Sequence, residues 1–245
     1  MLPEGLADAN SADYAKLQSR ADGLDALGLL DLVIRDVFAE RVTSVASFGT
    51  ESAVLLAMIA EVSPSVPVTF LDTGKHFQET LSYRDAVAAQ LGLTDLRVTH
   101  PDPLRLERYD GDSQLWRADP DGCCQLRKVE PLARALEGFD AWISGRKRYQ
   151  GWARVGIPML EWADGKVKVN PLADWSAEQV NAEFNRRNLP RHPLQAHGYL
   201  SIGCAPCTQA VSGDSGFVRA GRWAGQGKSE CGIHDHGLIQ AIGRP

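Results

Sequence analysis

Strands and helices alternate along the first 150 residues, and this pattern constrains the fold more than any other feature of the sequence. Short runs rich in β-branched and small residues predict buried strands at residues 42–47, 66–71, 96–99 and 141–144. Apolar residues at helical spacing predict helices at residues 25–41, 50–60, 79–91 and 124–136. This alternation predicts an α/β fold built on a doubly wound, mostly parallel sheet.

The remaining segments are less regular. Residues 101–122 are rich in Pro and Asp and predict a loop, and residues 146–165 predict irregular structure. A short strand is expected at 167–169, and the Ser176–Gln179 capping box predicts a helix that ends near Asn188. The expected organisation has three parts: a lead-in at 1–24, an α/β domain at 25–207, and a mobile C-terminal segment at 208–245.

Charge and hydropathy exclude several classes of protein. A net charge of −5 argues against a general nucleic-acid-binding surface, which would need the opposite sign. The longest apolar run, Ala53–Ala60, is far shorter than the ~20 residues of a membrane helix, and residues 1–11 do not resemble a signal peptide. We therefore expect a cytoplasmic protein with neither nucleic acid nor membrane as partner, and leave homo-oligomer formation open. The locally clustered basic residues favour a small anionic ligand.

Polar, glycine-containing loops follow three of the predicted strands, at 47–52, 72–76 and 145–149. In parallel sheets the ligand binds at the carboxyl ends of the strands, where glycine allows close approach and a helix start offers free amides. The first loop lacks the Gly-Lys-Ser/Thr ending of a Walker A motif. One such loop alone could be an ordinary turn, but three at equivalent positions predict a nucleotide site.

The five cysteines fall into two pairs and a single residue. Cys123 and Cys124 are adjacent, Cys204 and Cys207 form a Cys-x-x-Cys motif, and Cys231 stands alone. An odd number argues against a disulfide framework, and paired cysteines are typical of a thiolate-bound metal centre. Zinc, a [4Fe–4S] cluster and no metal all remain open, although adjacent cysteines suit the larger cluster better than one small ion.

Cys231 lies in the sequence Glu-Cys-Gly-Ile-His, where the following glycine leaves the sulfur accessible. The basic residues within twelve positions of it are Arg219, Arg222 and Lys228. Nearby cations supply the thiolate character that a reactive cysteine needs, which makes Cys231 a candidate nucleophile. The alternative interpretation is an idle surface thiol.

Taken together, these motifs resemble the sulfonucleotide reductases, and most closely the iron–sulfur type of bacterial adenylylsulfate (APS) reductase. The resemblance spans roughly residues 40–235 and rests on Ser47-Phe48-Gly49, Leu71-Asp72-Thr73-Gly74, Cys123-Cys124 followed by Arg127-Lys128, Gly145-Arg146-Lys147, Cys204 to Cys207, Gly221-Arg222-Trp223, and Glu230-Cys231-Gly232-Ile233-His234. The two cysteine pairs combined with a separate C-terminal Glu-Cys-Gly are highly specific, whereas any one loop alone would be weak.

The resemblance implies a fold similar to the adenine-nucleotide α-hydrolase (PP-loop) group and a set of site residues. The implied ligands of a [4Fe–4S] cluster are Cys123, Cys124, Cys204 and Cys207. The implied sulfate- and phosphate-binding residues are Lys128, Arg219 and Arg222. The implied adenylate-binding residues are Ser47, Phe48, Gly49, Thr50, Leu71, Asp72, Thr73, Gly74, Gly145 and Arg146.

The resemblance also implies a reaction. Cys231 would attack the sulfur of adenylylsulfate and release AMP, leaving an S-sulfocysteine. Thioredoxin or a similar dithiol would then release sulfite, as part of assimilatory sulfate reduction and cysteine biosynthesis.

Several alternatives stay open. The stretch Phe48–Ser52 is nearer to the cluster-free enzymes that act on phosphoadenylylsulfate (PAPS), so a PAPS reductase is the main alternative. A PP-loop ATP pyrophosphatase would carry a fuller Ser-Gly-Gly-x-Asp-Ser loop, which is absent. A zinc redox module would use Cys231 as its sensor and catalyse no turnover.

Overall fold

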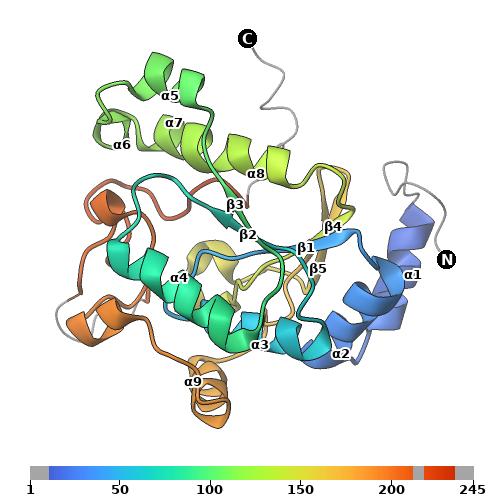
Figure 1. Cartoon of the computed structure of the whole chain (residues 1–245). Coiled ribbons are helices and arrows are strands. Elements are labelled where there is room, and N and C mark those ends of the chain that lie inside the picture. The colour runs from blue at the N-terminus through green and yellow to red at the C-terminus, as the bar shows by residue number, and fades with distance from the viewer. Residues whose placement is uncertain (1–10, 212–217, 235–245) are drawn as a thin grey trace.

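The computed structural model describes residues 11–211 and 218–234 and centres on a six-stranded sheet (Figure 1). Its strands are β1 (Val42–Val45), β2 (Val68–Leu71), β3 (Leu96–Thr99), β4 (Ala141–Ile143), β5 (Leu160–Ala163) and β6 (Lys166–Val169). They lie in the order β3-β2-β1-β4-β6-β5, and every neighbouring pair is parallel except β5 with β6. The predicted α/β fold with a mostly parallel sheet is confirmed.

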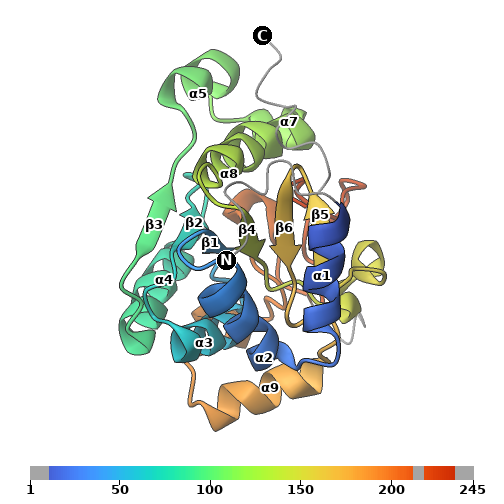
Figure 2. The ribbon, with the colours of Figure 1, turned by 90° about the vertical axis from the view of Figure 1, so that its right-hand side faces the viewer.

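Helices pack against both faces of this sheet. The helices are α1 (Ser11–Ala21), α2 (Ala26–Asp31), α3 (Ser52–Val62), α4 (Gln78–Leu91), α5 (Pro103–Asp110), α6 (Leu115–Ala118), α7 (Pro120–Cys124), α8 (Glu130–Ala135) and α9 (Ala177–Arg186), with π-helical turns η2 (Leu32–Val37) and η3 (Gln125–Val129) and 3₁₀ turns η4 (Arg148–Gln150), η5 (Trp152–Arg154), η6 (Pro193–His197) and η7 (Ala205–Cys207). In Figure 2, α2, α3, α4 and α9 lie on one side of the sheet, and α7 and α8 lie on the other.

Each face of the sheet has its own apolar core. The main core is built around α3, whose side chains are buried on all sides of the helix, as expected for a helix at the centre of a layer. The smaller core joins η3 and α8 to the strand ends through Leu71, Val129, Leu132, Leu136 and Trp142. Full burial of side chains of this size contributes roughly 1.5–3 kcal/mol each to folding. The carboxyl ends of β1, β2 and β4 are thereby fixed between the two layers.

The predicted loop at 101–122 is wrong, because this segment contains α5, α6 and most of α7. Asp102 caps α5 by accepting hydrogen bonds from the backbone N–H groups of Leu104 and Arg105, and Pro103 occupies the first turn. Both are ordinary helix-start signals that the high Pro and Asp content of the segment obscured. These helices form the arm that projects at the top of Figure 1.

The prediction of irregular structure at 146–165 is also wrong in part, because β5 lies there as an antiparallel edge strand. Asp164 and Gly165 both have positive φ, of 54° and 74°, at the turn between β5 and β6. An Asp-Gly pair in this conformation is the favoured two-residue hairpin turn, so the sequence did carry the signal.

Other local predictions hold. Gly92 ends α4 in the left-handed conformation with φ 64°, and Ser176 and Gln179 form the predicted capping box of α9. The predicted three-part division stays a prediction, because residues 1–10, 212–217 and 235–245 of its two terminal parts lie outside the described residues. Within residues 11–211 and 218–234, no helix has the length and apolar character needed to cross a membrane.

His192 makes a testable contribution to stability. It is 1% exposed and caps η6, where its Nδ1 accepts from the Leu194 N–H at 3.2 Å and its Nε2 lies 3.0 Å from Thr80 Oγ1. Burial lowers the pKa of His192 to about 4 from 6.5. Because the folded-state pKa is depressed, the neutral ring stabilises the fold above pH 6.5, and this contribution is lost as the pH falls toward 4. We expect the loss to reach about 3 kcal/mol of the free energy of unfolding.

Urea unfolding at pH 7 and at pH 4.5 measures this loss, with His192→Asn as the comparison because asparagine can still cap the turn. The variant should show a smaller drop in stability between the two pH values than the native chain. Equal drops in both proteins would assign the acid sensitivity to other groups.

Candidate active site

A cavity of about 190 Å³ lies at the carboxyl ends of β1, β2 and β4. The residues singled out from the sequence that line it are Ser47, Gly49, Thr50, Leu71, Lys128, Gly145, Arg146, Arg219, Arg222 and Cys231. Ser47 and Cys231 are 184 positions apart in the sequence (231 − 47), and both line the cavity. The fold therefore brings side chains from distant segments to one site. Phe48, Asp72, Thr73, Gly74 and the two cysteine pairs are not among the lining residues.

Phe48 lies under the cavity rather than in its wall. Its ring is fully buried and meets Phe70 edge-on, with 5.7 Å between the ring centroids. Its φ of 47° is in the left-handed region, which a bulky residue adopts only when its surroundings fix it. The buried ring therefore holds the turn from β1 to α3 that presents Gly49 and Thr50 to the cavity.

The loop that follows β2 faces the cysteines. The Thr73 hydroxyl lies 3.3 Å from Cys204 Sγ, and the Thr73 carbonyl accepts a hydrogen bond of 2.7 Å from Arg127 Nη1. Arg127 is itself held by a buried ion pair with Asp110 on α5. This network connects the β2 loop, the η3 turn and the projecting helical arm to the cysteine region.

Glu51 joins the β1 loop to the β4 loop. Its carboxylate accepts hydrogen bonds from Lys147 Nζ at 2.8 Å, from Gln150 Nε2 at 2.7 Å and from the Tyr149 hydroxyl. Burial opposes ionisation of Glu51, but Lys147 and these hydrogen bonds hold its pKa below the usual value. Glu51, Lys147 and Gln150 line the cavity. Glu51 lies in the loop 47–52 that the sequence singled out, but it was not named as a binding residue.

Arg146 is held at the cavity wall by polar partners from the β5–β6 hairpin. It forms an ion pair with Glu161, and its Nε lies 3.3 Å from the Asn170 side-chain oxygen. Burial lowers the pKa of Arg146, and the neighbouring Arg154 adds to this effect. The hairpin missed in the sequence therefore fixes one of the predicted site residues.

The two cysteine pairs come from separate elements. Cys123 and Cys124 are at the end of α7, whereas Cys204 precedes η7 and Cys207 is its last residue. An isolated bridge between His76 and Cys204, together with a 2.7 Å hydrogen bond from the Ala205 N–H to the Lys75 carbonyl, attaches the second pair to the β2 loop. All of these cysteines are free thiols, and three of the four are buried.

The thiols differ in their electrostatic surroundings. Burial raises the pKa of Cys123 to about 12 and that of Cys124 to about 11. Burial would raise the pKa of Cys204 too, but Lys128, Thr73 and Arg222 together lower it. Burial alone would lower the pKa of Lys128, yet the thiols of Cys204, Cys231 and Cys124 raise it. Lys128 is thus the cation between the cysteine pairs and Cys231.

Cys231 is held at the cavity by the residue before it. Glu230 forms a two-point ion pair with Arg154, with N–O distances of 2.6 and 2.9 Å, and a second ion pair of 3.1 Å with Arg219. Arg219 also donates to the Ser229 carbonyl at 2.7 Å. Burial, followed by the nearby Arg154, lowers the pKa of Arg219 to about 10, so it remains charged at neutral pH.

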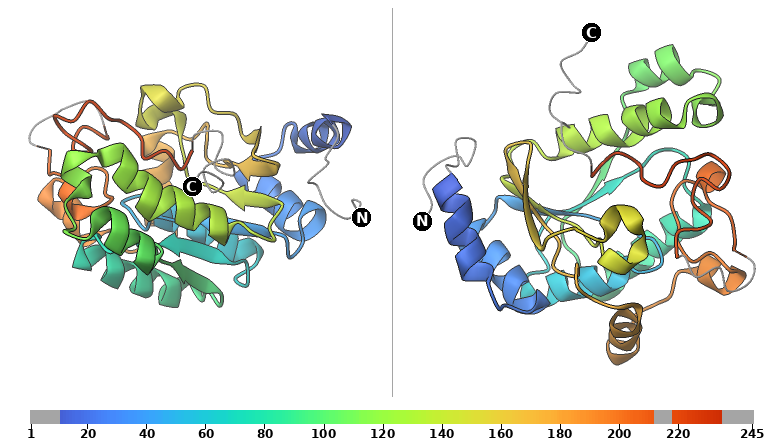
Figure 3. Two further views of the ribbon diagram at one scale, coloured as in Figure 1. Left: turned by 90° about the horizontal axis from the view of Figure 1, so that it is seen from above. Right: turned by 180° about the vertical axis from the view of Figure 1, so that it is seen from behind.

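Further contacts dock the same segment on either side of Cys231. Lys228 pairs with Asp121 on α7, and Ile233 packs against the smaller core. The ring of His234 stacks on Trp142 with 5.7 Å between centroids and 3° between planes. Figure 3 shows this segment, in red, running alongside α7 and α8. The structure therefore shows residues 228–234 docked at the cavity, with Glu230, Cys231, Ile233 and His234 among its lining residues.

The fold and the cavity define an α/β protein with a cationic site at the carboxyl ends of its strands and a cysteine in the wall of that site. Residues 41–210 match the phosphoadenosine phosphosulfate reductase domain model. The adenosine 5′-phosphosulfate reductase of Mesorhizobium japonicum is 46% identical, with 96% of this chain and 95% of that protein covered. The phosphoadenosine 5′-phosphosulfate reductase of Gloeobacter violaceus is 42% identical, with 80% and 83% covered. The chain therefore belongs to the phosphoadenosine phosphosulfate reductase family of enzymes.

Solved structures agree on the fold. The phosphoadenylyl-sulfate reductase of Candida auris superposes with a TM-score of 0.67 at 28% identity, with 82% of this chain and 98% of that chain covered. The FMN adenylyltransferase of Candida glabrata has a TM-score of 0.54 at 13% identity, with 83% and 72% covered, and shows likeness of fold alone. These neighbours confirm the predicted PP-loop type of fold.

Proposed function

We propose that this protein reduces adenosine 5′-phosphosulfate to sulfite and AMP, using thioredoxin or a similar dithiol as reductant. The observation that carries the proposal is the placement of Cys231 in the wall of the same cavity as Lys128, Arg219 and Arg222. A nucleophilic sulfur and three cations converge there at the strand ends where a nucleotide would bind. The family and the relatives named as reductases support this reaction class.

Arg222 gives the clearest support for an anionic substrate. Its side chain is buried, its Nε has no hydrogen-bond partner, and among the described residues no carboxylate forms an ion pair with it. Glu230 and Cys204 interact with Arg222 electrostatically but give its Nε no hydrogen bond, and a buried guanidinium that lacks such a partner is costly unless a ligand supplies a negatively charged acceptor. A sulfate or phosphate group in the cavity would supply that charge.

The substrate would then lie across the cavity with its adenylate over the three strand-end loops. We assign the adenylate to residues Ser47, Phe48, Gly49, Thr50, Leu71, Asp72, Thr73, Gly74, Gly145 and Arg146, with Phe48 and the Asp72–Gly74 turn shaping the loops from beneath. The sulfate end would face Lys128, Arg219 and Arg222. This places the sulfur of the substrate toward Cys231.

The chemistry follows from this orientation. The attacked sulfur carries anionic oxygens, so a thiolate is repelled unless cations offset the charge. The Cys231 sulfur forms a bond to the substrate sulfur, and the bond from that sulfur to the phosphate oxygen breaks, with the electron pair leaving on AMP. A thiolate of the dithiol then attacks Cys231 Sγ and releases sulfite. Its second thiol completes a disulfide and restores Cys231, so the two electrons come from the dithiol.

Cys123, Cys124, Cys204 and Cys207 fit a [4Fe–4S] cluster, and we propose that they hold one. They offer four free sulfurs, of which those of Cys124, Cys204 and Cys207 interact electrostatically with Lys128, and a bridge to His76 attaches Cys204 to the β2 loop. In the described part of the chain, no three His, Cys, Asp or Glu side chains are grouped so that they could hold a single ion. Four cysteine sulfurs are the ligand set of a [4Fe–4S] cluster. Bound there, the cluster would supply a structural cross-link and a fixed charge near Lys128.

Lys128→Ala should weaken adenylylsulfate binding more than AMP binding, because the lysine faces the sulfate end. We expect about a tenfold loss for adenylylsulfate and less than about a threefold loss for AMP, as for one charge-assisted contact. Isothermal titration with both ligands, in a Cys231→Ser background so that adenylylsulfate is not consumed, measures the difference. Lys75→Ala is the matched control, because Lys75 bonds to Ser113 at the surface and does not line the cavity. Equal losses of affinity for the two ligands would show that Lys128 does not face the sulfate end of the substrate.

The main alternative substrate is phosphoadenylylsulfate, because relatives of both specificities match the chain and the Phe48–Ser52 stretch resembles the PAPS enzymes. Side-by-side initial rates with the two sulfonucleotides and thioredoxin decide between them. We expect kcat/KM to favour adenylylsulfate by at least about tenfold, a difference of about 1.4 kcal/mol. The opposite preference would make the chain a PAPS reductase, and no sulfite from either would refute the proposed reaction.

A further inference from the structure

The aromatic ring of Trp223 lies close to four cations near the cysteine pairs and the cavity. The Trp223 ring centroid lies 4.4 Å from the Arg222 guanidinium, 5.8 Å from that of Arg219, 5.7 Å from Lys228 Nζ and 5.9 Å from Lys128 Nζ. All four distances are within the ~6 Å over which a ring face attracts a cation. The Trp223 ring therefore offsets part of the repulsion among four positive charges.

The guanidinium of Arg222 is confined on a second side by the backbone at Gly203. A Cβ added to Gly203 would lie only 2.5 Å from Arg222 Cζ and 2.7 Å from Nη1. Gly203 has no positive φ, so space rather than backbone conformation requires glycine there. Arg222 thus occupies a narrow slot between the Gly203 backbone and the Trp223 ring.

Trp223 itself is held under strain. Its side chain is 3% exposed, and its φ of 48° is unfavourable for a bulky residue. Its backbone N–H donates to the Cys207 carbonyl at 3.0 Å, which attaches the Trp223 backbone to the Cys-x-x-Cys loop. Its buried indole Nε1 has no hydrogen-bond partner, so the indole N–H does not explain its position. Four cations of the described residues lie over its ring.

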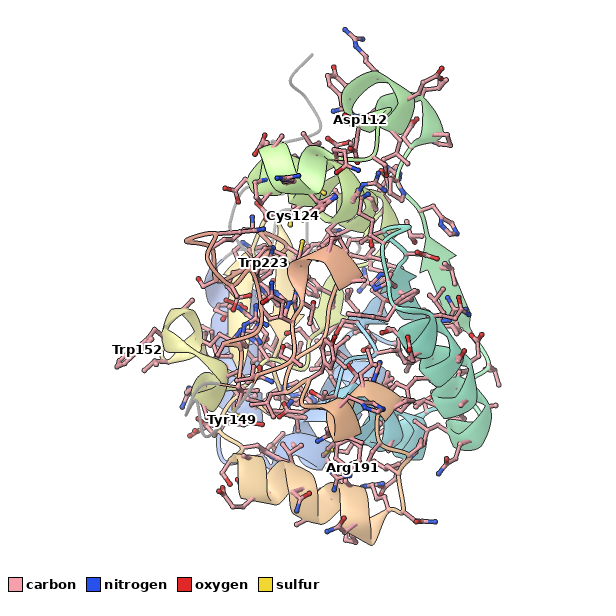
Figure 4. The ribbon with its side chains drawn as sticks, turned by 90° about the vertical axis from the view of Figure 1, so that its left-hand side faces the viewer. Asp112, Cys124, Tyr149, Trp152, Arg191 and Trp223 are labelled. Carbon is pink, nitrogen blue, oxygen red and sulfur yellow. The ribbon has the colours of Figure 1, made fainter. Side chains whose placement is uncertain are left out.

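Figure 4 labels Trp223 beside Cys124, with sulfur atoms between them. Lys128 connects the two residues, because it lies over the Trp223 ring and interacts electrostatically with the Cys124 thiol. The ring is therefore at the junction of the cysteine pairs and the cationic wall of the cavity.

We propose that Trp223 and Gly203 form a slot that fixes the Arg222 guanidinium toward the cavity, and that this slot sets the affinity for the sulfate end of the sulfonucleotide. This inference rests on the proposed function, because it names the residues that position one of its anion-binding groups. Trp223 is a positioning residue: it acts through Arg222 and does not touch the substrate. Its aromatic face, rather than its N–H group, carries the effect.

The test measures dissociation constants for adenylylsulfate and AMP by titration, in a Cys231→Ser background so that the substrate is not consumed. Trp223→Leu should weaken adenylylsulfate by about 5- to 30-fold, the range of one buried cation–π contact, with less than a threefold change for AMP. Trp223→Phe, which keeps a ring and lacks the N–H, should recover most of this loss. Gly203→Ala should behave like Trp223→Leu, because the methyl group displaces the end of the arginine.

A graded series isolates the ring electrostatics. Fluorinated tryptophans introduced at position 223 keep the shape and weaken the negative ring face, so the logarithm of the adenylylsulfate dissociation constant should rise steadily with fluorine number. Trp152→Leu is the matched control, because Trp152 is 83% exposed and points away from the body of the protein in Figure 4. Iron content, measured for each variant, should stay at the level of the parent protein.

The outcomes separate the slot from the proposed function. Equal losses for adenylylsulfate and AMP, a phenylalanine variant as weak as the leucine variant, or a flat fluorine series would overturn the inference. If the chain with an intact Cys231 released no sulfite from adenylylsulfate, the proposed function itself would be refuted. Selective losses together with a sloped series would establish the slot.

Discussion

Replacing Cys231 with serine is expected to lower sulfite release by at least about a thousandfold, because a hydroxyl is a far weaker nucleophile than a thiolate at neutral pH. The substitution changes one atom, and Glu230 would still hold the segment through Arg154 and Arg219. AMP affinity and iron content should therefore match those of the native protein. Sulfite assays, AMP titration and iron analysis on the same preparation measure all three.

Ser229→Ala provides the matched control for this prediction. Ser229 lies two positions before Cys231, is exposed, and contacts Arg219 only through its backbone carbonyl. Its loss should leave sulfite release within about twofold of the native rate, as for most surface substitutions. Retained turnover in Cys231→Ser would show that another group carries out the attack.

Cys204→Ser is expected to have the second large effect, on iron rather than on the nucleophile. Cys204 is the cysteine whose pKa is lowered by Lys128, Thr73 and Arg222 against the effect of burial, and a thiolate is the form that binds iron. Its replacement should reduce bound iron to less than about one tenth of the native content. The absorption at about 400 nm should be lost with the iron. Sulfite release should fall with the iron.

The two serine variants are controls for each other. Cys231→Ser should lose turnover and keep iron, whereas Cys204→Ser should lose both. A Cys204→Ser protein with full iron content would remove Cys204 from the ligand set, and an iron-free native protein with full activity would refute the cluster proposal.

The sequence predicted the layer architecture well because each central element carries a strong local signal. The apolar run of α3 and the β-branched strands β1 and β2 can be buried in few other ways. The edge of the sheet was harder to predict. The β5 strand is half-exposed, so its hydrophobic pattern is weak, and the Asp164–Gly165 turn was its clearest signal. The π-helical turn η3 inside a predicted continuous helix leaves no distinct mark in the residue pattern.

The candidate site was predictable to the extent that its residues belong to short motifs. Cys231, Arg219 and Arg222 were found because they cluster along the chain, and they do line one cavity. Glu51 and Arg154 were missed, because each acts through a partner that is remote in sequence: Lys147 for Glu51 and Glu230 for Arg154. Ion pairs of this kind are fixed by tertiary packing, which a single sequence does not reveal. The contacts of Ile233 with the smaller core and of His234 with Trp142 are likewise fixed by tertiary packing.

The most direct test of the account is the mass of the Cys231 peptide after reaction with adenylylsulfate in the absence of any dithiol. We expect this peptide to gain one sulfonate group and about one equivalent of AMP to be released per active site. Added thioredoxin should then remove the sulfonate group as sulfite. Release of AMP with an unmodified Cys231, or a sulfonate found on another cysteine, would contradict the account.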